Sequence, residues 1–65
     1  MDYIIRVGNE TFFGGWDPVF GEQIFTADEK LAYRMRRPLA VKTLEKLKGE
    51  YPNAEITKYD ETKVA

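Results

Sequence analysis

Hydrophobic residues follow two different periods along the chain, and each period predicts its own kind of element. Residues 3–7 (YIIRV) are β-branched and aromatic, which favours a strand. Alternation places Tyr3, Ile5 and Val7 on one face and the two residues between them on the other. Since neither face is purely polar, we expect both to be at least partly covered, or one to be a contact surface.

Turn residues divide the rest of the strand-like sequence into short segments. Residues 8–10 have turn chemistry, and 11–13 (TFF) predict a second strand that forms a hairpin with the first. Residues 14–21 (GGWDPVFG) predict a loop that is unusually apolar. Residues 22–25 indicate a short third strand, and residues 54–59 a closing strand.

A short helical turn is expected near residues 27–35. Thr26 and Glu29 have the spacing of a capping box, in which each side chain accepts from the other residue's backbone amide. Leu31, Ala32 and Met35 follow at a spacing that turns them inward.

The main helix is expected at about residues 38–49. Pro38 disfavours a helix that continues through Arg37, but it is favourable in the first turn of a new one. Gly49 is suited to end the helix. Four residues then form one helical stripe at i, i+4, i+7 and i+11: Ala40, Leu44, Leu47 and Tyr51.

These elements predict a small α+β fold. It consists of an antiparallel or mixed sheet of three to four strands, with the main helix packed on one face. Residues 1–59 form a single domain, and residues 60–65 are expected to be a disordered tail. The sheet face without the helix stays open, and Tyr3, Tyr59 and either Phe12 or Phe13 are the candidates for it.

Composition excludes several classes of chemistry. The 65 residues include no cysteine and no histidine, so disulfides, thiolate nucleophiles, Ser-His-Asp triads and the usual zinc sites are excluded. The acids Asp17, Glu22, Asp28 and Glu29 lack the spacing of a calcium-binding loop. We therefore expect neither an enzyme nor a cofactor or metal. We also expect no membrane association, because no stretch approaches the roughly 20 apolar residues of a membrane span.

The net charge of −1 conceals an uneven distribution. Residues 1–29 sum to −5, residues 30–48 to +6 and residues 49–65 to −2. The basic segment favours a nucleic-acid-binding alternative, in which 27–36 and 38–48 form a helix-turn-helix. The pI of about 5.3 argues against it. The candidate nucleic-acid contacts are Arg34, Arg36, Arg37, Lys42 and Lys46.

Four aromatic residues are candidate protein contacts. Trp16 and Phe20 lie in the apolar loop, where glycines flank an apparent interface anchor, although Trp16 could instead complete the small core. Tyr3 and Tyr59 are candidates for the open sheet face. A core of this size, with no covalent cross-link, also favours self-association.

The order of these elements resembles a class of small, uncharacterised α+β proteins encoded by phages and prophages of Gram-positive bacteria. The similar positions are Tyr3-Ile4-Ile5, Trp16, Phe25-Thr26, Ala32, the helix through Ala40 and Leu44, and Ile56. The resemblance implies a setting in the cytoplasm of a bacterial host. Together with the composition, it leads us to expect a non-enzymatic accessory protein. The expected partner is another protein or a second copy of the chain, which would form a homodimer. Nucleic acid is the alternative partner.

Overall fold

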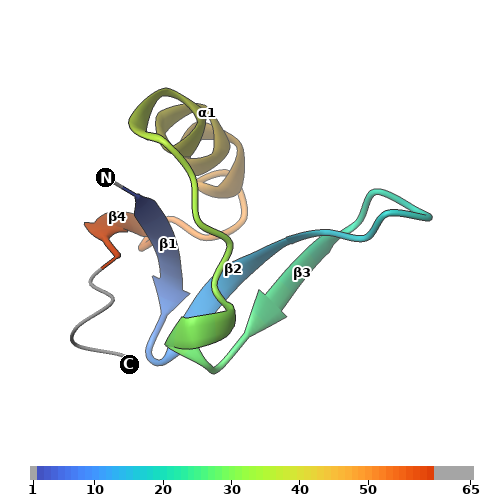
Figure 1. The fold of residues 1–65 in the computed structure, drawn as a ribbon. Coiled ribbons are helices and arrows are strands. Elements are labelled where there is room, and N and C mark those ends of the chain that lie inside the picture. Colours follow the sequence, from blue (N-terminus) through green and yellow to red (C-terminus); the bar gives the residue numbers. More distant parts are fainter. Residues whose placement is uncertain (1, 60–65) are drawn as a thin grey trace.

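The computed structural model describes residues 2–59, and the predicted disordered tail, 60–65, lies outside the described residues. Four strands form one antiparallel sheet in the order β3-β2-β1-β4. One main helix and one short 3-10 helix complete the α+β fold (Figure 1). The elements are β1 (Tyr3–Gly8), β2 (Thr11–Trp16), β3 (Gln23–Thr26), η1 (Glu29–Leu31), α1 (Arg37–Leu47) and β4 (Glu55–Lys58).

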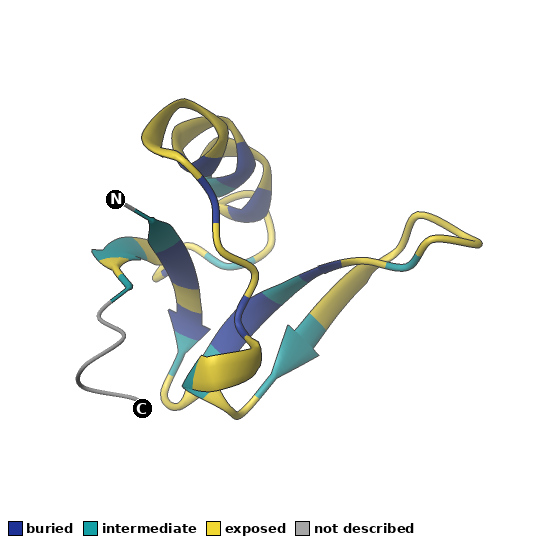
Figure 2. Cartoon of the chain, in the orientation of Figure 1, coloured by how far each residue is buried: buried dark blue, intermediate teal, exposed yellow. Residues whose placement is uncertain are grey.

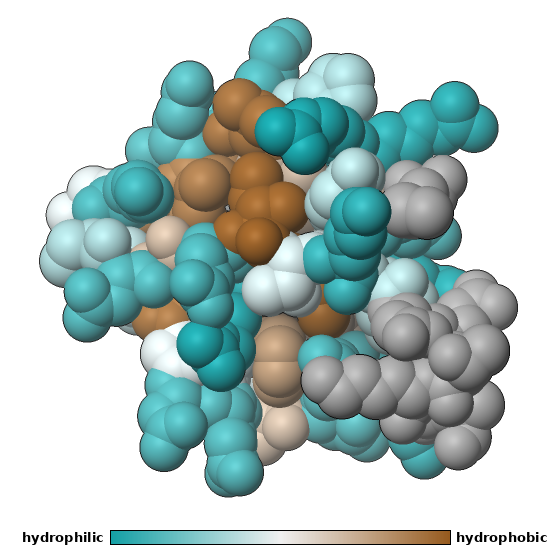
Figure 3. Space-filling model, turned by 90° about the vertical axis from the view of Figure 1, so that its left-hand side faces the viewer, coloured by the Kyte–Doolittle hydropathy of each residue, from teal (hydrophilic) through white to brown (hydrophobic). Residues whose placement is uncertain are grey.

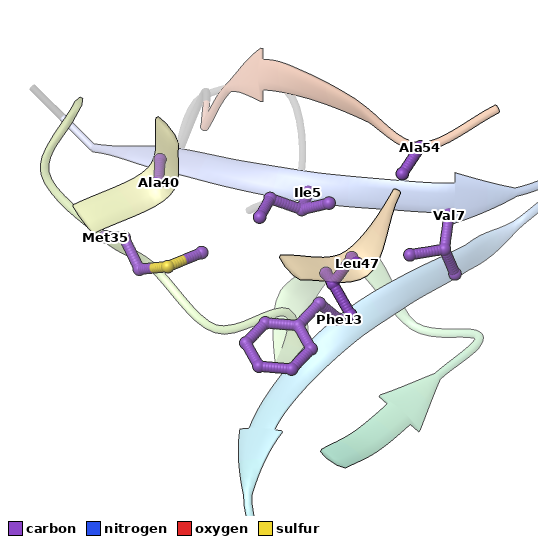
Figure 4. Close-up of a cluster of buried hydrophobic side chains, with 7 residues drawn as sticks. All are labelled: Ile5, Val7, Phe13, Met35, Ala40, Leu47 and Ala54. Atoms are coloured by element: carbon purple, nitrogen blue, oxygen red, sulfur yellow. The ribbon is translucent and has the colours of Figure 1, made fainter. Parts of the chain in front are cut away.

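Helix α1 covers one face of the sheet, and the larger hydrophobic core lies beneath it (Figures 2 and 4). Within the predicted stripe, Ala40 and Leu47 are buried, while Leu44 and Tyr51 are partly buried against the same core. Pro38 lies in the first turn of α1, as its fixed φ favours. The buried members of this core are Ile5, Val7, Phe13, Met35, Ala40, Leu47 and Ala54.

The opposite face of the sheet carries a smaller cluster. Ile4, Phe12 and Ala32 are buried there, and Tyr59 packs against them. The expectation that Tyr3 lies on this face is wrong. Alternation places Tyr3 on the same side as Ile5, and α1 covers that side, so Tyr3 packs against the larger core.

The chain between η1 and α1 joins β1 and β2 where these two strands diverge. The strands pair next to their hairpin turn, through Arg6 and Phe12. Further from the turn, the Tyr33 N–H donates to the Phe13 carbonyl at 2.8 Å. Met35 and Tyr3 exchange two backbone hydrogen bonds of 2.7 and 2.8 Å. This segment therefore completes the sheet between its two central strands (Figure 1).

The short helical turn predicted near 27–35 is confirmed, but it is shorter than expected. Only Glu29–Leu31 is helical, and it is a 3-10 helix capped by Asp28, whose carboxylate accepts from the Lys30 N–H at 2.9 Å. Thr26 does not form the expected capping box, because its hydroxyl accepts from the Asp28 N–H instead. Leu31 is exposed rather than turned inward.

Candidate functional site

The β2–β3 hairpin extends away from the rest of the fold, and the residues of its tip are exposed (Figures 1 and 2). Strand β2 continues through the predicted loop as far as Trp16, so the connection to β3 comprises only residues 17–22. Val19 and Phe20 in this connection are each 77% exposed. We call these two residues the apolar tip.

The apolar tip is held by hydrogen bonds within the turn. The Asp17 carboxylate accepts from the Val19 N–H at 2.8 Å and from the Phe20 N–H at 3.4 Å. The Asp17 carbonyl accepts from the Gly21 N–H at 2.7 Å. Gly21 has a φ of 69°, which favours glycine. The backbone that presents the tip is therefore fixed before any partner arrives.

Trp16 is the last residue of β2, next to the connection, and lies at the rim of the larger core. A bulge between Phe13 and Gly15, where Gly15 has a φ of 102°, puts Trp16 on the same face as Phe13. The Trp16 ring meets the Phe13 and Tyr33 rings edge to face, with centroids 4.9 and 5.6 Å apart. Trp16 is nevertheless 37% exposed, so it both packs on the core and offers contact surface.

We expect Trp16→Ala to lower the free energy of unfolding by about 1–3 kcal/mol, because it removes two aromatic contacts and part of the core's cover. Urea denaturation followed by circular dichroism measures this change. A loss below about 0.5 kcal/mol, the range of ordinary surface substitutions, would make Trp16 a contact residue alone.

The other two candidate protein contacts lie away from the hairpin tip and from each other. Tyr3 packs under α1 with the Arg37 guanidinium 5.8 Å from its ring centroid. Tyr59 packs on the opposite face, with the Arg34 guanidinium 4.9 Å from its ring centroid. Of the four candidates, only Trp16 and Phe20 therefore share one surface element.

The candidate nucleic-acid contacts are likewise divided. Arg34 and Arg37 lie over tyrosines on opposite faces of the sheet. Arg36 precedes α1, while Lys42 and Lys46 are exposed one helical turn apart on it. The helix-turn-helix is wrong, because the segment before α1 pairs with β1 and β2 and is too extended to form a first helix.

The acidic side chains with assigned contacts stabilise turns or an ion pair between strands. In the part of the chain that the structure describes, no group of three or more metal-ligating side chains comes together. Asp17 and Asp28 each accept backbone hydrogen bonds in a turn. Arg6 and Glu55 form an exposed ion pair of 2.7 Å between β1 and β4.

Apolar surface also occurs elsewhere. On α1, Leu39 is 43% exposed and Val41 is similarly accessible. Figure 3 shows brown apolar groups on the side of the molecule that lies at the left in Figure 1, bordered by hydrophilic side chains. The apolar tip differs from these residues in being both more exposed and displaced from the body of the fold.

The sequence pattern indicates Phe20 but not two other exposed apolar residues of the same hairpin, Val19 and Ile24. The signal for Val19 was the sequence DPVFG, in which Asp and Pro begin a turn and Gly ends it. Apolar side chains inside such a turn have no core to enter. The exposure of Ile24 cannot be predicted from the sequence, because a strand residue is exposed or buried according to which layers cover its face of the sheet.

Comparison with models of known families, with curated proteins and with solved structures finds no match to this chain. Among the helices of residues 2–59, none has the length and apolar character needed to cross a membrane.

Proposed function

We propose that this chain is a non-enzymatic binding protein, and that the apolar tip of the β2–β3 hairpin docks into another protein. The observation that carries the proposal is the exposure of Val19 and Phe20, 77% each, on a turn that Asp17 holds in place. Fixing the backbone in advance lowers the entropy lost on binding. An aromatic residue at a protruding tip matches the buried anchors that dominate protein interfaces.

The surroundings of the tip indicate the chemistry of the partner. Asp17 and the exposed Glu22 border the two apolar side chains, and the hairpin carries no basic residue between Thr11 and Thr26. An apolar pocket with a basic rim complements this arrangement. An anionic lipid surface does not, because it would repel both carboxylates.

The contact is tested by photo-cross-linking in an extract of the cells that make the protein. The photoreactive residue p-benzoylphenylalanine replaces Phe20 in one variant and Leu39 in a matched control. We expect one discrete product with another protein from position 20 and none from position 39. Equal products from both positions, or none, would contradict the proposal. Cross-linked nucleic acid would favour the alternative based on Arg34, Arg36, Arg37, Lys42 and Lys46.

We also propose where the protein acts. The resemblance to small phage and prophage proteins supports action in the cytoplasm of a bacterial host. Within that setting, the two exposed apolar side chains of the tip support contact with another protein as the mode of action.

A further inference from the structure

The two edges of the sheet differ in how they are protected. Strand β4, at one edge, carries the exposed charged residues Glu55 and Lys58, and Figure 3 shows hydrophilic side chains over much of that side. Strand β3, at the other edge, has no charged residue and no proline from Gln23 to Ala27. Charge and proline are the usual means of preventing edge-to-edge pairing. Only β4 is therefore protected in this way.

The backbone groups that β3 turns outward can be assigned. The Phe13 carbonyl bonds Tyr33 and so points away from β3. Phe13 is paired with Phe25, and paired residues alternate between bonding each other and bonding outward. The N–H and C=O of Phe25 therefore point outward.

The other end of the strand gives the same result independently. The Glu22 carbonyl accepts from the Asp17 N–H at 2.7 Å, so the backbone groups of Glu22 point toward β2. Those of Gln23, the next residue, therefore point away from β2, toward the free edge. No backbone bond to a residue outside the β2–β3 pair reaches Gln23 or Phe25 within residues 2–59.

We propose that this free edge pairs with β3 of a second copy, antiparallel about a two-fold axis centred on Ile24. Gln23 of each copy then lies opposite Phe25 of the other, and each such pair exchanges two backbone hydrogen bonds. Ile24, which is 42% exposed, meets Ile24 of the second copy in a non-hydrogen-bonded pair, where side chains are closest. The result is one continuous sheet through both molecules.

Charge selects this register over the neighbouring one. Side chains on the two strands must alternate in phase, so the two-fold axis passes through a residue, and the two residues that centre the pairing on β3 are Ile24 and Phe25. An axis through Phe25 places Glu22 directly opposite Asp28 of the second copy, which is unfavourable. An axis through Ile24 places Glu22 opposite Thr26 instead. Of the two central registers, charge therefore favours the one centred on Ile24.

A single cysteine tests both the pairing and the register, because the native chain has none. In Ile24→Cys, the two sulfur-bearing residues face each other with Cα atoms roughly 4.5 Å apart, which is suitable for a disulfide. Gln23→Cys is the register control, since its two copies are offset along the strands. Lys58→Cys is the control for the β4 edge.

In an oxidising glutathione buffer, we expect Ile24→Cys to form disulfide-linked dimers at least roughly tenfold faster than either control, because pairing raises the local thiol concentration towards the millimolar range. Equal rates for the three variants would overturn the pairing. A Gln23→Cys rate matching that of Ile24→Cys would overturn the register.

Sedimentation equilibrium of the unmodified chain provides a second measurement that needs no cysteine. We expect a concentration-dependent dimer that Ile24→Lys converts to monomer, with the fold of the variant checked by circular dichroism. A monomer up to millimolar concentration would overturn the proposal, as would a dimer unaffected by Ile24→Lys. The pairing uses the edge of the hairpin and not its apolar tip, so it stands or fails independently of the proposed function.

Discussion

Phe13→Ala is expected to destabilise the protein by about 3–5 kcal/mol, the usual range for truncating a buried aromatic residue. Phe13 has no exposed surface and lies at the centre of an aromatic cluster. Its ring is 4.9 Å from the Trp16 centroid and 6.1 Å from those of Phe25 and Tyr33. A chain of this length has a total stability of only about 3–10 kcal/mol. The variant is therefore expected to lose a large share of the native stability.

Thermal unfolding followed by circular dichroism measures this effect, and Phe20→Ala is the matched control because it makes the same change at an exposed position. We expect the midpoint of Phe13→Ala to fall by at least roughly 12 °C and that of Phe20→Ala to change little. Equal shifts in the two variants would show that the tip residue packs on the core in solution, contrary to the structure.

Replacing both residues of the apolar tip, Val19→Ser with Phe20→Ser, is expected to weaken binding strongly while leaving the fold intact. The physical reason is that neither side chain packs on a core cluster, whereas an anchor residue in an interface contributes about 2 kcal/mol or more. We expect the affinity for the partner protein to fall at least roughly 30-fold. The free energy of unfolding should change by less than about 0.5 kcal/mol.

The control on α1 is Leu39→Ser with Val41→Ser, which makes the same kind of change at two apolar residues that are partly exposed on another element. We expect this control to retain full affinity. Loss of affinity in both variants would indicate nonspecific adhesion of apolar surface rather than a defined contact.

Local sequence patterns were sufficient to predict most of the elements. The β-branched and aromatic residues of 3–7 define β1, and the spacing from Ala40 to Leu47 defines the buried side of α1. Proline and glycine marked the turns because they restrict or extend φ in ways that do not depend on distant contacts. These features explain why the α+β fold could be predicted from one sequence.

The arrangement of residues 27–35 could not be predicted, because it depends on distant residues. Tyr33 and Met35 adopt an extended backbone because they bond to the backbone groups of Phe13 and Tyr3. Those groups are available because β1 and β2 diverge there. Two paired extended residues then outweigh a weak helical propensity. The candidate site was only half predicted for the same reason. Phe20 was identified from its loop, whereas placing Tyr3 required knowing which sheet face α1 covers.

The most direct test of the central claim compares the affinities of Phe20→Ser and Leu39→Ser for the protein recovered by cross-linking at position 20. Isothermal titration calorimetry measures both affinities. The proposed contact predicts an affinity at least roughly 30-fold weaker for Phe20→Ser than for Leu39→Ser, with both variants as stable as the native chain. Equal affinities for the two variants would show that the apolar tip is not the binding surface.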